Sequence, residues 1–336
     1  MWVLRMKTDA EGRLERRKTR LVIKRFQQRE GIDFQDVFAP VSIAPTLRLL
    51  LAAAAVCGWK VEQMDVKTAF LYGVVDEEIY MKQPEGYDDG SGRVCRLNQA
   101  IYGLKQAPRC WYARLVEALE ALGFKVSGCD ESLFMTKGEE EKVFLLVYVN
   151  DILLFSPSLE RIKEVQGKLQ GPWTSGVLPW SSRGAGRGEG MSRTLRWFEI
   201  QFSTTQPTPL IFDHRLTSLF PDKPSESSGP YAELVGCLMY LMTCTRPDLA
   251  FPLSVLSRFV ATGRHRPIQW TAAVRVAKYP ATTSGMGLVL GGTQPVELTG
   301  HCDSSYADDV ETQRSTQGYC FSLGAGAVSW RSTRSS

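Results

Sequence analysis

Residues 143–155 constrain the fold of this chain more than any other segment. They read as seven apolar residues, the polar pair Asn150-Asp151 and four further apolar residues. An apolar run rich in Val, Leu and Phe, interrupted once by a polar pair, favours two buried strands over a helix. The sequence therefore predicts a β-hairpin in the middle of a sheet, with Asn150 and Asp151 at its tip. A carboxylate there is costly to desolvate unless a cation binds it.

A second strand-like segment, residues 61–66, carries an acidic side chain, Asp65, near its end. Two strands that deliver carboxylates to one place would form a divalent-metal site, because Mg²⁺ binds a few carboxylates together with substrate phosphates. Two simpler interpretations stay open. Asp65 could cap the turn that follows it, and Asn150-Asp151 could be an ordinary hairpin turn, since both residue types favour turns.

The bulk composition is that of a soluble globular protein, with 43% apolar and 23% charged residues in a chain of 336, enough for two or three domains. No apolar stretch reaches the roughly 18 residues that cross a bilayer, and the first residues do not form a signal peptide. We therefore expect an intracellular protein, cytoplasmic or nuclear, with no membrane partner.

Cysteine and histidine offer little chemistry in this sequence. The eight cysteines show no Cys-x-x-Cys and no metal-finger spacing, so we expect reduced, mostly buried thiols. All three histidines lie beyond residue 210, which argues against a His-based metal or nucleophilic site.

Positive charge is concentrated at the amino-terminal end. Residues 1–30 hold ten Lys or Arg against four acidic residues, and most of these cations fall between positions 13 and 25. Such a patch could face an anionic polymer or a triphosphate. A solvated charged face explains the composition equally well.

The periodicity of apolar residues predicts an α+β fold, with helices on one face of a sheet. Its order is strand, helix, strand and hairpin. The predicted helices are 46–57, 108–122, 159–169, 234–242 and 249–259, and the predicted strands outside the hairpin are 61–66, 78–82, 133–135, 296–302 and 318–323. Residues 171–193 are rich in Gly, Ser and Arg without a usable period, which predicts a flexible linker or a disordered insert.

Five segments resemble the reverse transcriptase of copia-type long-terminal-repeat retrotransposons, in order and spacing as well as in residues. They are KTRLV (18–22), QMDVKTAFL (63–71), YMKQPEG (80–86), IYGLKQAPR (101–109) and YVND (148–151). The resemblance resumes in the connecting region of the same polyprotein, at GCLMYL (236–241) and TRPD (245–248). It ends with segments similar to the opening of the ribonuclease H domain, CDSSYAD (302–308) and RSTQGY (314–319).

The resemblance implies a right-hand polymerase fold of fingers and palm with an antiparallel palm sheet. A partly degenerate connection and a truncated ribonuclease H-like β-hairpin follow. The implied domains are the fingers and palm (1–168), a degenerate or flexible linker (169–196), a thumb- or connection-like helical region (197–292) and a ribonuclease H-like fragment (293–336). The implied activity is RNA-directed DNA polymerisation, with an RNA template, a DNA primer and dNTPs as partners.

The resemblance also assigns roles to the residues of the polymerase centre. Two Mg²⁺ ions would be held by Asp65 and Asp151, with Asn150 at a third catalytic position. The triphosphate would contact Lys18 and Arg20, a role suited to a point charge and to a planar guanidinium.

Two further substrate-binding roles follow from the same motifs. Gln106 would contact the template or the dNTP, although it could simply cap the helix that begins at Pro108. Tyr72 lies near the position at which the family checks for a 2′-hydroxyl.

The sequence departs from the family pattern at the hairpin tip, where the family has Tyr-x-Asp-Asp and this chain has Asn150. The site would fall from three carboxylates to two, facing two ions that together carry four positive charges. Because Mg²⁺ depends on anionic oxygen, our hypothesis is that polymerase activity is absent or strongly reduced.

Two other segments depart from the family. The family has an ordered helix and strand where this chain has residues 171–193, and a shifted reading frame could explain their composition. The ribonuclease H resemblance supplies only Asp303, whereas that chemistry needs about four carboxylates around its metal ions, so we expect no hydrolase activity. Two alternatives to the polymerase interpretation are a non-catalytic nucleic-acid-binding remnant of the same fold and an unrelated α+β metalloenzyme that uses Asp65 and Asp151.

Overall fold

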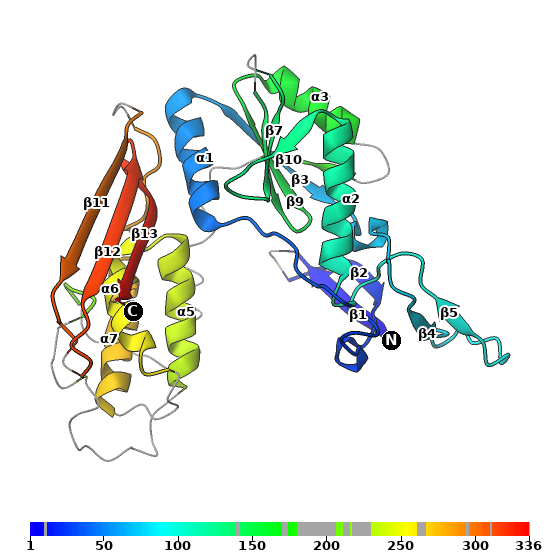
Figure 1. Ribbon diagram of the computed structural model, residues 1–336, viewed down its shortest axis with the longest axis horizontal. Coiled ribbons are helices and arrows are strands. Elements are labelled where there is room, and N and C mark those ends of the chain that lie inside the picture. Colours follow the sequence, from blue (N-terminus) through cyan, green and yellow to red (C-terminus); the bar gives the residue numbers. More distant parts are fainter. Residues whose placement is uncertain are drawn as a thin grey trace. The chain divides into compact units, whose positions relative to one another are not determined.

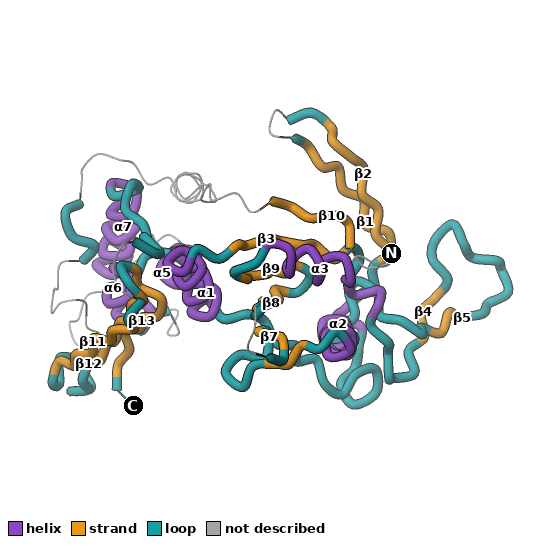
Figure 2. The backbone as a smooth tube through the Cα atoms, turned by 90° about the horizontal axis from the view of Figure 1, so that it is seen from above, coloured by secondary structure: helices purple, strands orange, loops and turns teal. Residues whose placement is uncertain are grey.

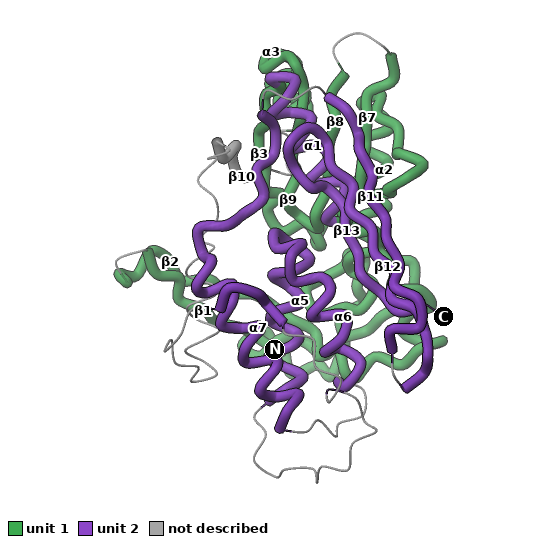
Figure 3. Tube along the Cα trace, turned by 90° about the vertical axis from the view of Figure 1, so that its left-hand side faces the viewer, with its two compact units in different colours: residues 1–43, 59–180 green, residues 44–58, 181–336 purple. Residues whose placement is uncertain are grey.

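The computed structural model describes residues 1–9, 12–138, 142–169, 174–179, 206–210, 216, 230–260, 267–292, 296–309 and 311–335. The chain divides into two compact units: unit 1 comprises residues 1–43 and 59–180, and unit 2 comprises residues 44–58 and 181–336 (Figure 3). Residues 44–58 therefore belong to unit 2, although the sequence on both sides of them belongs to unit 1. The domain boundaries given by the family resemblance stay predictions.

Unit 1 is built on a six-stranded sheet in which all neighbouring strands are antiparallel (Figure 1). Its strand order is β10 (Thr174–Pro179), β3 (Lys60–Val66), β9 (Asp151–Ser156), β8 (Phe144–Tyr148), β7 (Leu133–Thr136) and β6 (Phe124–Val126). The predicted hairpin is confirmed as β8 and β9, and its tip is Val149-Asn150, with Asp151 already paired in β9. Mixed helices and antiparallel sheets confirm the predicted α+β class.

Strand β10 corrects one prediction. It lies within residues 171–193, where composition indicated a flexible or disordered segment, and it pairs with β3 from Thr174 to Pro179. The pairing supplies backbone hydrogen bonds that composition does not reveal, because a strand partner distant in sequence can order a Gly/Ser-rich segment. Residues 180–205, including the predicted strand remnant Phe198-Glu199-Ile200, lie outside the described residues.

Both long helices of unit 1 cover the same face of this sheet. Successive side chains of a strand point to opposite faces, and in β3 the side chains of Met64 and Val66 are buried. They share one apolar core with Trp111 of α2 (Ala107–Ala121) and Ile162 of α3 (Leu159–Leu169). Gln63 and Asp65 point to the other face and are only half-buried, so the sheet keeps one face for polar residues.

Two smaller ribbons complete unit 1, and both extend away from the six-stranded sheet (Figure 2). One pairs β1 (Trp2–Thr8) with β2 (Leu14–Leu21), and the other pairs β4 (Tyr80–Lys82) with β5 (Val94–Arg96). Two short 3₁₀ turns belong to the same unit: η1 (Arg25–Gln27) follows β2 in the chain, and η2 (Ala69–Tyr72) lies between β3 and β4.

Gly103 allows the segment after β2 to approach the start of α2. Its φ is +97°, and a Cβ at this position would lie 2.2 Å from the carbonyl oxygen of Ile23. The Ile23 N–H donates to the carbonyl of Tyr102 at 2.9 Å. Only glycine combines this backbone conformation with such a close approach.

Unit 2 contains a helical cluster and a three-stranded antiparallel sheet. The helices are α5 (Tyr231–Cys244), η4 (Pro247–Leu249), α6 (Ala250–Ser257) and α7 (Pro267–Thr282), and residues of α5, α6 and α7 share one apolar core. The strands are β11 (Leu298–Ser305), β12 (Thr316–Leu323) and β13 (Gly326–Arg334). Pairing of β11 with β12 was predicted, whereas β13 and α7 were not.

Helix α1 (Ala44–Cys57) packs on the sheet of unit 2 through a buried arginine. The guanidinium of Arg48 donates to the carbonyls of Val328, at 2.7 Å, and Thr243, at 2.5 Å. It also lies 3.9 Å from the ring centroid of Trp330. Burial lowers the pKa of the Arg48 guanidinium, and the carbonyls and the ring replace the water that the charge has lost.

All five predicted helices are present, as α1, α2, α3, α5 and α6. All eight cysteines are unpaired thiols, as expected, but the prediction that most are buried is wrong, since only Cys110 is buried. Several of the other cysteines are exposed. Cys302, for example, lies on β11, a strand whose residues are all exposed. In the described parts of the chain, no helix combines the length and apolar character required to cross a bilayer.

Candidate polymerase centre

Asp65 and Asp151 face each other across two neighbouring strands. They are direct partners in the antiparallel register of β3 and β9, and directly opposite residues place their side chains on the same face of a sheet. That face is the one opposite the α2 and α3 helices, and both carboxylates are half-buried there. The predicted convergence of the two acidic residues from adjacent strands is therefore present.

Each of these carboxylates accepts a hydrogen bond from a side-chain amide. The Asn150 Nδ2 group donates to Asp65 Oδ1, and the Gln63 Nε2 group donates to Asp151 Oδ1 at 3.1 Å. Like charges placed opposite each other destabilise a sheet, and these two amides supply partial positive charge to the pair. The Asn150 amide thus presents its N–H to one of the two carboxylate oxygens of Asp65.

The hairpin tip is held in an unusual backbone conformation. Val149 has a φ of +59°, which is costly for a β-branched residue, by about 1–3 kcal/mol. Two hydrogen bonds hold the tip: Trp111 Nε1 donates to the Val149 carbonyl at 2.7 Å, and the Val66 N–H donates to the Asn150 carbonyl at 2.9 Å. The core helix α2 and the strand β3 therefore fix where Asn150 lies.

The donor set at this centre fits one divalent cation. Asp65 and Asp151 provide two anionic oxygen ligands on one face, and Mg²⁺ is commonly bound by one or two carboxylates together with substrate phosphates. Within the ranges that the structure describes, no group of three or more His, Cys, Asp or Glu side chains is arranged so that it could hold a metal ion. The anionic charge for a second ion at the same place is not supplied by these residues.

One face of the β1–β2 ribbon carries five basic residues and one apolar residue, Val3 opposite Arg20. Arg5 is the cross-strand partner of Lys18, Lys7 is the partner of Arg16, and Arg20, two residues beyond Lys18, points to the same face. Two like-charge pairs directly opposite each other destabilise the ribbon unless an anion lies over them. Arg5, Lys7 and Arg16 are exposed on this face, whereas Lys18, Arg20 and Val3 are half-buried.

Lys18 is the member of this face whose electrostatics are most perturbed. Burial, followed by the charges of Arg20, Lys7 and Arg16, lowers the pKa of the Lys18 amine, while attraction to Asp65 opposes the shift. Lys18 is therefore within electrostatic reach of Asp65 as well as of the ribbon cations.

Arg20 is positioned by an aromatic ring. Its guanidinium lies 4.9 Å from the ring centroid of Tyr102, and Tyr102 itself packs edge-on against Phe70 at 5.4 Å between centroids. The buried Nε of Arg20 has no hydrogen-bond partner among the described residues. Stacking thus orients the guanidinium while leaving donor capacity for a ligand.

Gln106 lies apart from the carboxylate pair, fully buried in a network of its own. Its Nε2 donates to the Asp33 carbonyl at 2.8 Å and to Glu77 at 3.2 Å, and its Oε1 accepts from Gln28 at 3.0 Å. It occupies the N-cap position of α2, but its side chain makes no capping hydrogen bond, so the alternative role as a side-chain cap is wrong. Contact with template or dNTP stays a prediction, and it would require these hydrogen bonds to be exchanged.

Tyr72 and Asp303 are the remaining predicted site residues. Tyr72 ends η2 and packs against the core, with its ring centroid 6.1 Å from that of Trp111. Asp303 belongs to unit 2, where it is exposed on β11 opposite Gly318. The Ser304 N–H donates to its carboxylate at 2.8 Å.

Sequence reasoning missed three residues of this region, Gln63, Arg5 and Lys7. A period of two leads from Asp65 back to Gln63 on the same face of a strand, so this signal was available. Arg5 and Lys7 follow the same alternation in the segment 2–8, but their meaning depends on the register with Lys18 and Arg16. That register cannot be read from composition.

Comparison with known proteins agrees with this geometry. The family model described as reverse transcriptase (RNA-dependent DNA polymerase) matches residues 1–174. The chain is 34% identical to the retrovirus-related Pol polyprotein from transposon TNT 1-94 of Nicotiana tabacum, over 98% of this chain and 26% of the relative. It is also 34% identical to that from transposon RE2 of Arabidopsis thaliana, over 99% of this chain and 24% of the relative.

The chain thus spans about a quarter of the length of these two relatives. A shorter relative, a putative transposon Ty5-1 protein of Saccharomyces cerevisiae, is 30% identical over 81% of this chain and 92% of its own length. The family model covers the carboxylate pair, the basic ribbon and every strand of the sheet before β10, and the two Pol polyproteins match nearly the whole chain. The chain belongs to the reverse transcriptase family, among the copia-type, retrovirus-related Pol polyproteins of transposons.

Proposed function

We propose that unit 1 is the polymerase part of a reverse transcriptase, which adds dNTPs to the 3′-hydroxyl of a DNA primer on an RNA template. The observation that carries the proposal is the pairing of Asp65 with Asp151 on the helix-free face of the sheet. In this proposal the six-stranded sheet is the palm and the β1–β2 ribbon belongs to the fingers. Lys18 and Arg20 would bind the triphosphate, Gln106 the nascent base pair, and Tyr72 would lie beside the sugar.

The proposed centre depends on charge compensation. Asp65 and Asp151 would hold Mg²⁺, which when bound supplies the positive charge that offsets the triphosphate and the leaving pyrophosphate. The chain's own cations act on the same substrate from the other side: Lys18 as a point charge, and Arg20 as a planar donor oriented by Tyr102. Together they would align the α-phosphate with the primer hydroxyl.

We further propose that Asn150 strongly reduces this activity. A third carboxylate at position 150 would bring the anionic charge at the centre closer to that of two divalent ions, whereas the amide brings none. The Asn150 N–H also occupies Asp65 Oδ1, so metal binding would have to displace a hydrogen bond. Asparagine thus weakens the centre by a missing charge and by competition.

Primer extension on an RNA template tests both parts of the proposal, with Mg²⁺ and then Mn²⁺, in the wild-type chain and in Asn150→Asp. We expect extension by Asn150→Asp to exceed that of the wild type by at least tenfold. The double variant Asn150→Asp, Asp65→Asn is the matched control. It has two carboxylates at the centre, as the wild type does, but none at position 65 opposite Asp151, and it should be inactive. Equal rates in the wild type and Asn150→Asp would contradict the effect assigned to Asn150, and extension by the double variant would contradict the role of Asp65.

A second candidate function is nucleic-acid binding without chemistry. The specific observation in its favour is the basic face of the β1–β2 ribbon, with Arg5 opposite Lys18 and Lys7 opposite Arg16. Such a face would bind a phosphate backbone with salt-sensitive affinity and no metal requirement. Binding of an RNA–DNA hybrid that is unchanged by a chelator, in a chain that extends no primer in either metal, would favour this candidate.

For the remainder of the chain we keep the sequence-based proposals. Residues 169–196 would link the polymerase to a thumb- or connection-like region (197–292), and residues 293–336 would be the opening of a ribonuclease H-like domain containing Asp303. We also keep the sequence-based proposal of an intracellular location, cytoplasmic or nuclear.

A further inference from the structure

Arg48 of α1 is a buried cation without a carboxylate partner among the described residues, and it is only 6% exposed. Its Nε donates to Val328 and its Nη1 to Thr243 and Cys244, in each case to the backbone carbonyl. The third nitrogen, Nη2, makes no hydrogen bond to the described residues. Carbonyl dipoles stabilise the guanidinium but do not neutralise it, so its positive charge and the N–H donors of Nη2 are left for a ligand.

A cavity of about 330 Å³ is lined by this arginine, and all of its lining residues belong to unit 2. The side chains that matter for a ligand are Arg48, Met239, Met242, Leu253, Trp330 and Arg331. No acidic residue is among the described residues that line it. Ligand-binding cavities have volumes from about 300 Å³ and combine an apolar lining with a few polar groups. This cavity therefore offers apolar contacts beside a buried positive charge.

Trp330 is held in place at the cavity by two contacts. Its ring centroid lies 3.9 Å from the guanidinium carbon of Arg48, and its indole N–H donates to the Met242 carbonyl at 3.2 Å. The side chains of Met239 and Met242 are unbranched and flexible, so they can adapt to the shape of an apolar ligand. The lining thus suits a linear apolar chain better than a rigid polar molecule.

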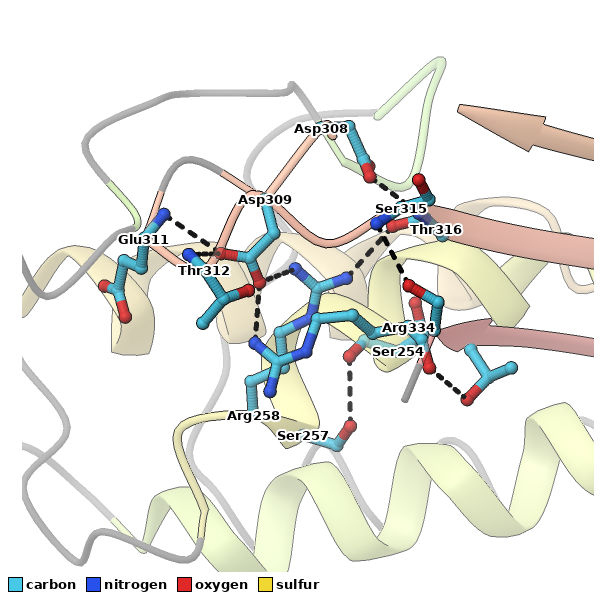
Figure 4. Close-up of polar contacts among 12 residues, drawn as sticks. Ser254, Ser257, Arg258, Asp308, Asp309, Glu311, Thr312, Ser315, Thr316 and Arg334 are labelled. Carbon is cyan, nitrogen blue, oxygen red and sulfur yellow. Dashed lines mark hydrogen bonds and ion pairs between the residues drawn. The ribbon is translucent and has the colours of Figure 1, made fainter. Parts of the chain in front are cut away.

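Other polar groups near the cavity are already used within the protein. The Ser257 hydroxyl, at the lining, donates to the Ser254 carbonyl at 3.1 Å (Figure 4). Asp309 is the one buried acidic residue that the structure describes in unit 2. Its Oδ2 accepts from Arg258 at 3.0 Å and from Arg334 at 2.6 Å (Figure 4). That carboxylate is therefore not available to neutralise the guanidinium of α1.

We propose that this cavity binds a medium-chain alkanoate, with its carboxylate on Arg48 and its aliphatic chain against Met239, Met242 and Leu253. Charge complementarity selects the head group, because a carboxylate would neutralise the buried cation through charge-assisted hydrogen bonds. Burial of apolar surface selects the tail. The proposal goes beyond the polymerase function, since it assigns a small-molecule site to unit 2.

Isothermal titration calorimetry of octanoate into the full chain, in chelator and without nucleic acid, tests the proposed site. We expect saturable binding at one site. Hexanoate should bind about tenfold more weakly, because two methylene groups are lost. The alcohol 1-octanol, which has the chain without the charge, should also bind about tenfold more weakly, because it forms no charge-assisted hydrogen bond. Octylammonium, which carries the opposite charge, should show no saturable binding.

Met239 offers a matched pair of variants, because it lines the cavity and is partly exposed on α5. Met239→Glu places a negative charge at the cavity and should weaken octanoate binding by about fivefold or more. Met239→Gln has nearly the same shape without the charge and should keep the wild-type affinity. Ala232→Glu adds the same charge at an exposed position of α5 that does not line the cavity, and it should also keep the wild-type affinity.

Arg48→Gln tests the contact with the head group and should reduce the affinity for octanoate to that for 1-octanol. Since Arg48 also holds α1 on its sheet, thermal unfolding of each variant checks that it folds. If Arg48→Gln does not fold, the ligand series and the Met239 pair decide the proposal.

Five outcomes would overturn the proposal. The first two are an absence of saturable octanoate binding and equal affinities for octanoate and 1-octanol in the wild type. The third and fourth are equal octanoate affinities in Met239→Glu and Met239→Gln, and an equal loss in Met239→Glu and Ala232→Glu. The fifth is wild-type octanoate affinity in a folded Arg48→Gln. Because no metal or nucleic acid is present, a failure of the polymerase proposal leaves these outcomes unaffected.

Discussion

Asn150 donates its side-chain amide to the carboxylate of Asp65, across the gap between the hairpin tip and β3. Since Asp65 is also the register partner of Asp151, one amide stabilises a pair of like charges that would otherwise repel. A carboxylate at position 150 should therefore lower the stability of the metal-free protein and strengthen its binding of a metal ion.

In Asn150→Asp both effects are expected to be measurable without any catalytic assay. In chelator the variant should unfold more easily than the wild type, by about 1–3 kcal/mol, because a donor is lost and a third negative charge is added. Added Mg²⁺ should raise its melting temperature more than that of the wild type, because a ligand that binds only the folded state stabilises it. Asn150→Ala, which loses the donor without adding charge, should show no larger response to Mg²⁺ than the wild type. Identical Mg²⁺ responses in Asn150→Asp and Asn150→Ala would contradict this expectation.

Trp111→Phe should loosen the hairpin tip. The change removes the N–H donated to the Val149 carbonyl and part of a fully buried ring, at a cost of about 2 kcal/mol or more by denaturant unfolding. Hydrogen exchange at the backbone amides of Asn150 and Asp151 should accelerate. Tyr112→Phe deletes a hydrogen bond of the same length, to the Glu131 carbonyl at 2.7 Å, and should leave exchange at the tip unchanged. Equal effects of the two variants at the tip would show that Trp111 does not hold it.

Asp309 should make unit 2 sensitive to acid. Burial raises the pKa of this carboxyl, but hydrogen bonds from Arg334, Thr312 and Glu311 and the charge of Arg258 lower it to about 2. A folded-state pKa below the ordinary value of 3.8 means that the stabilisation is complete above about pH 4 and is lost as the pH falls towards about 2. The loss amounts to about 2 kcal/mol. The free energy of unfolding, measured in urea between pH 5 and pH 2, should fall more steeply with decreasing pH for the wild type than for Asp309→Asn. Equal pH dependence in the two proteins would contradict a lowered pKa of Asp309.

Gly103→Ala separates steric clash from backbone strain. A methyl group would lie 2.2 Å from the Ile23 carbonyl oxygen, at a φ of +97°, so we expect a loss of 3 kcal/mol or more, of which only about 1 kcal/mol is due to the positive φ. Gly123→Ala is the matched control in the same unit, because its φ is +85° and no atom lies within 4 Å of the added Cβ. Similar melting temperatures for the two variants would exclude a close approach at Gly103.

The sequence was most informative where the pattern is local. The apolar run around Asn150-Asp151 and the alternation through Asp65 predicted both strands that meet at the centre, because a period of two fixes which side chains share a face.

The features that could not be predicted depend on partners distant in sequence. Strand β10 is ordered by pairing with β3, and the basic face of the ribbon exists only in the register that places Arg5 opposite Lys18. The burial of Gln106 likewise depends on Gln28, Asp33 and Glu77. Non-local pairing of this kind leaves little trace in the composition of a single segment.

Helix α1 has a consequence for how this polypeptide can be divided. It is encoded among residues of unit 1, yet Arg48 donates to carbonyls of Val328 and Thr243. A fragment that stops near residue 180 would carry α1 without the sheet on which Arg48 and Ala52 pack. A fragment that starts at residue 181 would lack a layer over its own sheet. Neither half is a self-sufficient module, so laboratory expression has to keep both in one translation product.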